Sequence, residues 1–232
     1  MRFGVVTFPG SNCDYDMIHV LREVLHQDVE ALWHKNEIPD YFTEDDYLIL
    51  PGGFSYGDYL RSGAIARFSK IMESVISFAE RGGKIIGICN GFQILCESGL
   101  LPGVLVRNQN QKFICKNIYI KQLENNSVLY NEELQNTALK IPIAHAEGRF
   151  YADNQTLNEL KENNQIVYQY CDVNGDIIDS ANLNGSVMNI AGISNKKGNI
   201  VGLMPHPERA AEKILGNEDG RLILETICKL AY

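Results

Sequence analysis

Short apolar segments alternate with longer segments of helical periodicity in the first 100 residues, and this alternation restricts the fold more than any other feature. The apolar segments that are short enough to be buried strands are residues 3–8, 29–33, 47–50 and 84–89. Strands that alternate with helices in this way form mostly parallel sheets, with helices on both faces. The sequence therefore predicts an α/β fold with a mostly parallel, mixed central sheet that is covered on both faces.

Apolar residues spaced three or four apart predict the helices between these strands. Three helices are expected here, at residues 17–25, 65–79 and 90–98. Asn12 or Asp14 is the expected N-cap of the first helix, and Gly99 ends the third.

The second half of the chain is richer in strand patterns, at residues 104–107, 113–121, 139–144, 166–171 and 200–204. Two further segments, 153–162 and 221–230, have helical patterns. The sequence has no internal repeat, low-complexity tract or change of composition that would mark a linker. We therefore expect one domain over residues 1–232.

The composition narrows the partners and the compartment. The formal net charge is −8, the pI is near 5.2, and the basic residues are scattered, so nucleic acid and anionic membranes are poor candidate partners. No apolar run is long enough to span a membrane. The six cysteines form no C-x-x-C pair and no ligand-spaced set, and the N-terminus lacks a signal-peptide pattern. We expect free thiols in a reducing cytoplasm and no metal.

The segment Gly87-Ile88-Cys89-Asn90-Gly91 has the pattern G-x-C-x-G between a predicted strand and a predicted helix. A nucleophile on such a sharp turn needs small flanking residues. The turn exposes the Cys89 thiol at the carboxyl edge of the sheet, near the positive end of the following helix, which favours the reactive thiolate. The alternative is a buried cysteine that only packs, and the strand–turn–helix context favours the nucleophile. The other cysteines have no such setting, so no chemistry is assigned to them.

A histidine that is followed two residues later by a carboxylate occurs twice. Pro207 keeps His206 out of the helical conformation, and residues i and i+2 of an extended chain point the same way. Glu208 would then fix the tautomer of a base at His206, which is the logic of a nucleophile–base–orienter triad. His145 and Glu147 have the same spacing, so spacing alone leaves both histidines open.

A tetrahedral intermediate also needs hydrogen-bond donors that point at its oxygen. The backbone N–H of Asn90, directly after the nucleophile, is one expected donor. The Gly52-Gly53 pair, which follows the predicted strand 47–50, can supply the second donor. A double glycine after a strand is also an ordinary turn signal. Its value as evidence comes from its agreement with the G-x-C-x-G turn at Cys89, which is called the elbow below.

With these residues placed, the chain resembles the class I (triad-type) glutamine amidotransferases, whose elbow reads G-x-C-x-G-x-Q and is completed here by Gln93. Longer segments resemble the glutaminase subunits of bacterial-type phosphoribosylformylglycinamidine synthases: PGSNCDYD at 9–16, PGGFSYGDYLRSGAIAR at 51–67, GICNGFQIL at 87–95, AHAEGRF at 144–150 and GLMPHPERA at 202–210. The resemblance covers essentially the whole length. It implies a flavodoxin-like class I amidotransferase fold.

The resemblance also implies a catalytic triad of Cys89, His206 and Glu208. Cys89 would attack the side-chain amide of glutamine, His206 would shuttle the proton, and Glu208 would hold the imidazole. The backbone N–H groups of Gly53 and Asn90 would form the oxyanion hole. The implied glutamine contacts are Gln93, His145 and Glu147. This assignment favours the histidine of the PHPE segment as the base.

The partners and cofactors follow from the same resemblance. The chain has no G-x-x-x-x-G-K-[ST] motif, so we expect no cofactor on it and expect Mg-ATP on a separate large synthetase subunit that works with a small third subunit. Residues 54–67 are the expected docking region. The alternatives are an amidotransferase subunit of a different synthetase, a cysteine hydrolase of similar fold and a non-catalytic binding subunit. Segment 51–67 argues against the first two, and the filled triad positions argue against the third.

Overall fold

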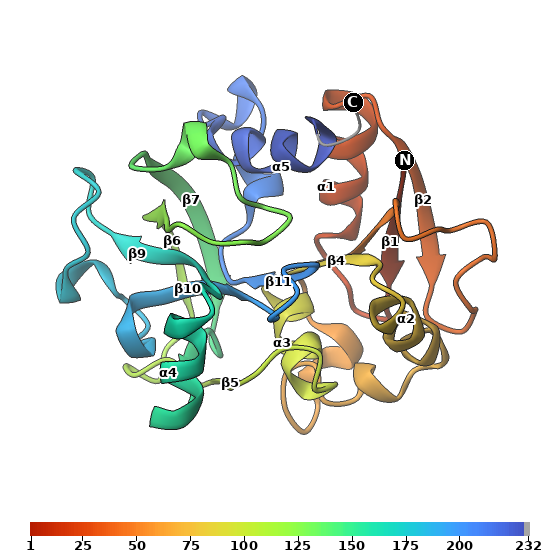
Figure 1. The fold of residues 1–232 in the computed structure, drawn as a ribbon, viewed down its shortest axis with the longest axis horizontal. Coiled ribbons are helices and arrows are strands. Elements are labelled where there is room, and N and C mark those ends of the chain that lie inside the picture. The colour runs from red at the N-terminus through yellow and green to blue at the C-terminus, as the bar shows by residue number, and fades with distance from the viewer. Residues whose placement is uncertain (230–232) are drawn as a thin grey trace.

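The alternating segments of the sequence form a central sheet with helices on both faces (Figure 1). The computed structural model describes residues 1–229. The strands are β1 (Arg2–Thr7), β2 (Asp28–Trp33), β3 (Tyr47–Leu50), β4 (Lys84–Ile88), β5 (Val104–Val106), β6 (Ile114–Gln122), β7 (Ala138–His145), β8 (Arg149–Tyr151), β9 (Ile166–Cys171), β10 (Ile190–Ser194) and β11 (Ile200–Leu203). The α-helices are α1 (Asp14–His19), α2 (Lys70–Glu80), α3 (Asn90–Glu97), α4 (Asn154–Glu162) and α5 (Asp219–Lys229).

The main sheet has nine strands in the order β2-β1-β3-β4-β11-β10-β9-β6-β7, and β5 pairs with β8 in a separate small sheet. The strands from β2 to β11 run parallel, and the remaining pairs are antiparallel. All residues of β3 and β11 are buried, as expected for parallel strands with helices on both faces. This arrangement confirms the predicted mixed α/β sheet.

Several element boundaries differ from the prediction. Cys13 is the N-cap of α1, instead of Asn12 or Asp14, and the helix continues into a π-helical turn at Val20–Val24. The second helix begins at residue 70 instead of 65, because Ser69 has an extended backbone with ψ of 151°. Phe68 therefore lies before the helix instead of within it, and it is 78% exposed.

Two strands, β8 and β10, were not predicted. The last predicted helix, 221–230, corresponds to α5, and Leu230 lies outside the described residues. In the part of the chain that the structure describes, no helix combines the length and apolarity needed to cross a bilayer.

The sheet order brings three distant segments together at one edge. β3, β4 and β11 are neighbours and run parallel, with Leu50 opposite Gly87 and Gly87 opposite Gly202. Their carboxyl ends therefore lie side by side. The edge strand β7 returns to the same place, since the backbone N–H of His206 donates a hydrogen bond to Pro142 O at 2.9 Å. The segments that follow these strands can thus build one site.

Candidate active site

Cys89 occupies a sharp turn between β4 and α3. Its backbone has φ of 48° and ψ of −101°, a conformation that a side-chain-bearing residue rarely adopts and that functional sites retain. Both neighbouring glycines are required by close backbone contacts. A Cβ atom on Gly87 would lie 2.7 Å from the carbonyl carbon of Gly91, and one on Gly91 would overlap the carbonyl oxygen of Leu50. The G-x-C-x-G pattern thus reflects the packing of the turn against β3.

His206 and Glu208 form a buried pair at the end of β11. Nδ1 of His206 lies 2.6 Å from Oε1 of Glu208, and the two residues are 1% and 2% exposed. The expected backbone is wrong at this point: His206 is non-helical, but Glu208 lies in a 3-10 turn, Pro207–Arg209, instead of an extended chain. The turn brings the carboxylate back towards the ring, so the contact forms by a different route from the one predicted.

The protonation state of His206 follows from its partners. Burial alone would lower its pKa, but the Glu208 carboxylate and the nearby Cys89 raise the pKa of His206 well above its ordinary value. Nδ1 donates its proton to Glu208, which leaves Nε2 with no hydrogen-bond partner among the described residues. The ring is therefore a strong base with one nitrogen oriented by a carboxylate and the other available for a thiol proton.

Cys13, to which no chemistry was assigned from the sequence, lies beside this pair. Its Sγ, a ring nitrogen of His206 and a carboxylate oxygen of Glu208 all lie within 4.8 Å of one another. A Cβ atom on Gly52 would be 2.5 Å from Cε1 of His206 and 3.2 Å from the Cys13 sulfur, so this glycine makes room for both. Burial raises the pKa of the Cys13 thiol, although His206 opposes the shift.

The same three side chains form the only group within residues 1–229 whose donor atoms are close enough to hold a metal ion. Cysteine, histidine and glutamate are suitable ligands for zinc. In this cluster, however, His206 and Glu208 already use one donor atom each in their mutual hydrogen bond. We therefore assign the cluster to the base and its environment.

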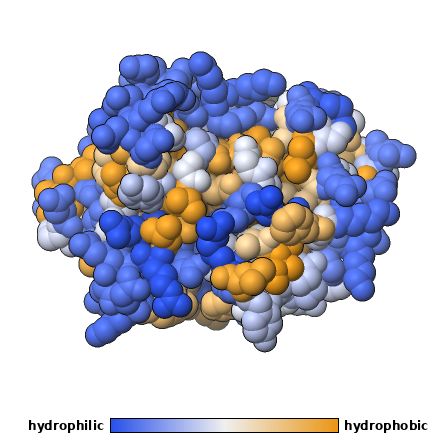
Figure 2. All heavy atoms as spheres, turned by 90° about the horizontal axis from the view of Figure 1, so that it is seen from below, coloured by the Kyte–Doolittle hydropathy of each residue, from blue (hydrophilic) through white to orange (hydrophobic). Residues whose placement is uncertain are grey.

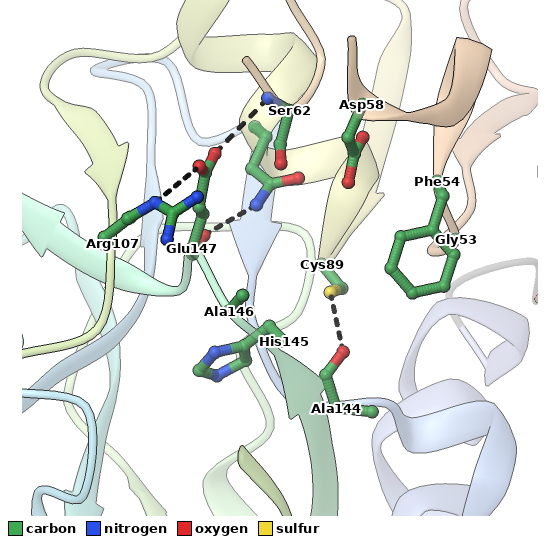
Figure 3. Close-up of a pocket in the computed structure, with 11 residues that line it drawn as sticks. Gly53, Phe54, Asp58, Ser62, Cys89, Arg107, Ala144, His145, Ala146 and Glu147 are labelled. Atoms are coloured by element: carbon green, nitrogen blue, oxygen red, sulfur yellow. Dashed lines mark hydrogen bonds and ion pairs between the residues drawn. The ribbon is translucent and has the colours of Figure 1, made fainter. Parts of the chain in front are cut away.

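A cavity of about 190 Å³ opens over Cys89 (Figure 3). Its walls are formed by Gly53, Phe54, Asp58, Ser62, Cys89, Gln93, Arg107, Ala144, His145, Ala146 and Glu147. The Cys89 thiol lies 3.9 Å from the carbonyl oxygen of Ala144, at the end of β7. Gly53 has φ of 132°, and a Cβ atom there would lie 2.5 Å from the backbone nitrogen of Asn12, so this wall also requires glycine. The cavity thus gives small molecules access to a thiol that is itself only 4% exposed.

The hydrogen bonds of Asn108 determine the tautomer of His145. Nδ2 of Asn108 donates to Lys112 O and His145 O, at 2.8 and 2.9 Å. Its Oδ1 accepts from Gly148 N at 3.1 Å and lies 3.1 Å from Nδ1 of His145. Because this oxygen can only accept, Nδ1 of His145 must carry the proton.

His145 and His206 therefore differ in their pKa values and in the groups that orient their rings. Burial, and then the charge of His206, lower the pKa of His145 to about 3, so its ring is neutral at physiological pH. The Glu147 carboxylate does not orient this ring: it accepts from Ser62 N at 3.3 Å and pairs with Arg107 Nε at 3.8 Å. The spacing left two candidate bases, and the contacts favour His206.

Asn90 and Gln93, on the first turn of α3, connect the elbow to both walls of the cavity. Oδ1 of Asn90 accepts from Ser55 N at 3.1 Å, and its Nδ2 donates to Gln93 Oε1 at 2.9 Å. Nε2 of Gln93 then donates to the backbone oxygen of Glu147 at 2.6 Å. The loop after β3, the elbow and the segment after β7 are thus held together by one hydrogen-bonded chain.

Comparison with known proteins identifies this architecture. A family model for CobB/CobQ-like glutamine amidotransferase domains matches residues 1–220. The chain belongs to this glutamine amidotransferase family.

Relatives of the amidotransferase match over nearly its whole length. The phosphoribosylformylglycinamidine synthase subunit PurQ of Alkaliphilus metalliredigens is 52% identical over 228 residues, which cover 98% of this chain and 95% of the relative. The same subunit of Salinibacter ruber is 50% identical over 226 residues, with 97% and 95% covered. A chain in the structure of PurLQS from Thermotoga maritima matches with a TM-score of 0.85 and 40% identity, over 100% of this chain and 99% of that one. These matches confirm the resemblance inferred from the motifs.

Several residues of the cavity and of its surroundings were not singled out from the sequence. Asp58 and Ser62 lie within segment 51–67, where length and composition gave no reason to choose single residues. Arg107 and Asn108 directly follow β5, a strand of the small separate sheet, so their positions depend on contacts with Glu147 and His145 and no local signal marks them. Cys13 follows β1 at the carboxyl edge of the main sheet, and its meaning depends on a contact with a histidine 193 positions away (206 − 13).

Proposed function

We propose that this amidotransferase is the glutaminase subunit of a phosphoribosylformylglycinamidine synthase. It hydrolyses glutamine and delivers the ammonia to a synthetase subunit, which converts formylglycinamide ribonucleotide to the amidine with ATP. The relatives named for this synthase match nearly the full chain. The observation that carries the chemistry is the position of Cys89, on a strained turn under a cavity and beside the His206–Glu208 pair.

The first half of the reaction forms a thioester. His206 takes the proton of Cys89, and the thiolate adds to the side-chain amide carbon of glutamine. The backbone N–H groups of Gly53 and Asn90 stabilise the oxyanion of the tetrahedral intermediate, a role in which each donor typically supplies about 2.7–4 kcal/mol. The protonated imidazole then gives its proton to the leaving nitrogen, and ammonia departs.

The second half returns the enzyme to its starting state. His206 removes a proton from water, which adds to the thioester carbonyl carbon. Collapse of the second intermediate expels the Cys89 thiolate, which recovers its proton from the imidazole, and glutamate is released. Glu208 holds Nδ1 at 2.6 Å throughout and stabilises the imidazolium in both halves. Gln93, His145 and Glu147 contribute to the walls that hold the substrate.

The partners follow from this division of labour. We place Mg-ATP and the nucleotide substrate on the large synthetase subunit, which acts together with a small third subunit, and we place no cofactor on this chain. The matched structure from Thermotoga maritima is that of PurLQS, which agrees with a Q subunit that acts together with two other subunits. Because a catalytic thiol must stay reduced to act as a nucleophile, we propose the reducing cytoplasm as its compartment.

Transfer of the amide nitrogen tests the proposal. The chain is combined with its partner subunits, Mg-ATP, formylglycinamide ribonucleotide and glutamine labelled with ¹⁵N at the side-chain amide. Wild type should place the label in the amidine, whereas Cys89→Ser should place none there and should still support synthesis from free ammonia. Loss of both activities in Cys89→Ser would contradict the separation of glutaminase from synthetase. Absence of label with wild type, despite synthesis from ammonia, would contradict the assigned pathway.

A further inference from the structure

We propose that Arg107 and Asp58 make the cavity specific for a free amino acid, with Arg107 binding the α-carboxylate of glutamine and Asp58 binding its α-ammonium group. The inference rests on the proposed glutaminase function and assigns the recognition of the part of the substrate that does not react. Both residues line the cavity above Cys89 and reach it from different sides (Figure 3).

Arg107 is the cation of the cavity wall. Among the residues that line the cavity it is the one arginine or lysine, and His145 is neutral there. Its side chain is 66% exposed, and the distance from its Nε to Oε1 of Glu147 is long, at 3.8 Å. Such a guanidinium has N–H groups that can donate further hydrogen bonds, and its planar geometry matches that of a carboxylate. An α-carboxylate that enters the cavity therefore finds a cation that is only loosely paired.

Asp58 is an anion whose contacts are with neutral groups. Asn90 Nδ2 donates to its Oδ1 at 3.3 Å, and no ion pair involves Asp58 within residues 1–229. Burial, and then the negative charge of Glu147, raise the pKa of Asp58 to about 6. A partly buried carboxylate beside a second carboxylate is electrostatically costly, and a cation bound between them removes that cost. The α-ammonium group of an amino acid is such a cation.

The charges of the cavity match those of the whole substrate. Two carboxylates, Asp58 and Glu147, and one guanidinium line the walls, so the site carries an excess of one negative charge when all are ionised. A zwitterion places its carboxylate at the guanidinium and its ammonium group at the excess negative charge. A simple amide without these groups gains neither contact. The cavity therefore selects the amide of a free amino acid over the amides of proteins and of other metabolites.

The backbone conformation around Asp58 indicates that the surrounding structure fixes the position of this residue. Tyr56, Gly57, Asp58 and Leu60 all have positive φ, and Asp58 itself has φ of 53°. Three of these residues carry side chains, for which this conformation costs about 1–3 kcal/mol each unless the surroundings enforce it. The network through Asn90 holds the loop against the elbow and directs the carboxylate into the cavity.

Deleting charges from both the substrate and the protein tests the proposal. Removal of the α-carboxylate from glutamine gives 4-aminobutanamide, and removal of the α-amino group gives glutaramate. Each is tested as a substrate, and as a competitive inhibitor of glutamine hydrolysis, with the chain assembled with its partner subunits. The variants are Arg107→Met, which keeps the length without the charge, and Asp58→Asn, since asparagine tolerates positive φ. Arg81→Met is the matched control, because Arg81 pairs with Glu44 and lies outside both the cavity wall and segment 54–67.

In each variant, the affinity for an analogue that lacks the group bound by the replaced residue should stay as in wild type. Arg107→Met should raise the KM for glutamine by roughly 10- to 100-fold, as expected for one hydrogen bond to a charged group, and leave the Ki of 4-aminobutanamide within about 2-fold. Asp58→Asn should raise the KM for glutamine by a similar factor. It should also raise the Ki of 4-aminobutanamide and leave the Ki of glutaramate unchanged. The control should behave as wild type.

The opposite results are equally specific. Equal losses on glutamine and on the analogue that lacks the matching group would overturn the assignment of that residue. If both analogues bind too weakly to measure, the kinetics with glutamine test the assignment alone. A variant with a lower kcat and an unchanged KM for glutamine would also overturn the assignment of its residue. Failure of the wild-type complex to hydrolyse glutamine would instead contradict the proposed function and would leave these variants without a role in it.

Discussion

At the scale of single residues, the proposed base, His206, is surrounded by groups that come from three separate segments. His206 contacts Glu208, two residues away, but Cys13 and Gly52 come from the first quarter of the chain. The neutral thiol of Cys13 fills the space beside the ring where a charged or larger side chain would compete for it. We expect Cys13 to act as a positioning residue that keeps the imidazole in place.

Truncation of Cys13 tests this role. Cys13→Ala leaves a gap beside the ring, and we expect kcat for glutamine hydrolysis to fall by about 10-fold with KM unchanged, since small misplacements of reacting groups are costly. Cys13→Ser, which keeps a polar atom of similar reach, should recover part of the loss. Cys171→Ala, at another buried cysteine, is the control. Unchanged kcat and pH profile in Cys13→Ala would show that the thiol only fills space.

Removal of the base should cost more than removal of its orienting group. We expect His206→Ala to lower kcat by about 10²–10⁴-fold, the usual contribution of a general base. Glu208→Ala should lower it by a smaller factor, because Nε2 of the ring can still take the thiol proton. Steady-state ammonia release measures both. Equal losses would mean that the carboxylate does more than orient the ring.

His145 makes stability depend on pH. Its folded pKa of about 3 lies below its unfolded value, so between pH 6.5 and 3 the unfolded chain binds a proton that the folded chain does not. Acidification from pH 6.5 should therefore destabilise the fold by up to about 1.4 kcal/mol per pH unit through this residue. Urea unfolding of wild type and His145→Gln at pH 7 and 5 should show a smaller loss in the variant. Parallel losses would place the acid sensitivity elsewhere.

At the scale of secondary structure, the predicted strands share a strong local signal. β3 and β4 are short apolar runs between glycines and charged residues, and their bounds were found to within one residue. β8 has three residues, and β10, Ile190–Ser194, contains a glycine and follows an Asn-rich turn, so neither has enough periodicity to be seen. The pairing of β10 with β9 and β11, rather than its own sequence, makes it a strand.

The same distinction applies to the site. Cys89, His206 and Glu208 could be chosen because short motifs surround them. Cys13, Asp58, Arg107 and Asn108 could not, since their contacts are with residues that are distant in sequence. Local patterns predict where a side chain leaves the backbone, but not which buried groups will face it after the sheet has formed.

Gly91, in the first turn of α3, and Gly99, just after the end of that helix, are glycines for different reasons. A Cβ atom on Gly91 would overlap the carbonyl of Leu50, whereas Gly99 has φ of 74° and open space around it. Gly99→Ala should therefore cost about 1 kcal/mol of unfolding free energy, from backbone strain alone. Gly91→Ala should cost more than about 3 kcal/mol, because the elbow must move away from β3. Urea unfolding measures both, and equal costs would contradict the close contact.

At the scale of the whole molecule, the segment that forms one wall of the cavity also exposes apolar side chains. Figure 2 shows apolar side chains among polar ones on the side seen from below Figure 1. In segment 54–68, Phe54, Tyr59, Leu60 and Phe68 are exposed, and Leu60 reaches 93%. Exposed apolar groups with a polar rim are typical of surfaces that bind a protein partner. This location next to the cavity suits a synthetase that receives ammonia.

A charge placed in this segment should weaken the complex. We expect Leu60→Lys to lower the affinity for the synthetase by at least about 10-fold, as for an interface residue that contributes to binding. Ile214→Lys is the matched control, because Ile214 is 88% exposed but lies outside the segment. Calorimetric titration with the large subunit compares them. Equal affinities of the two variants would exclude Leu60 from the interface.

The position of β11 has a consequence for how the protein is made. Among residues 1–229 it is the last strand, yet it lies between β4 and β10 in the sheet. While the ribosome is still translating the final segment, both of those strands have an open edge, which is where other chains can add. The proposed nucleophile, Cys89, also leaves the ribosome 117 residues before the proposed base, His206 (206 − 89). A nascent chain therefore lacks its base until β11 has been made, and it cannot hydrolyse glutamine before that strand can close the sheet.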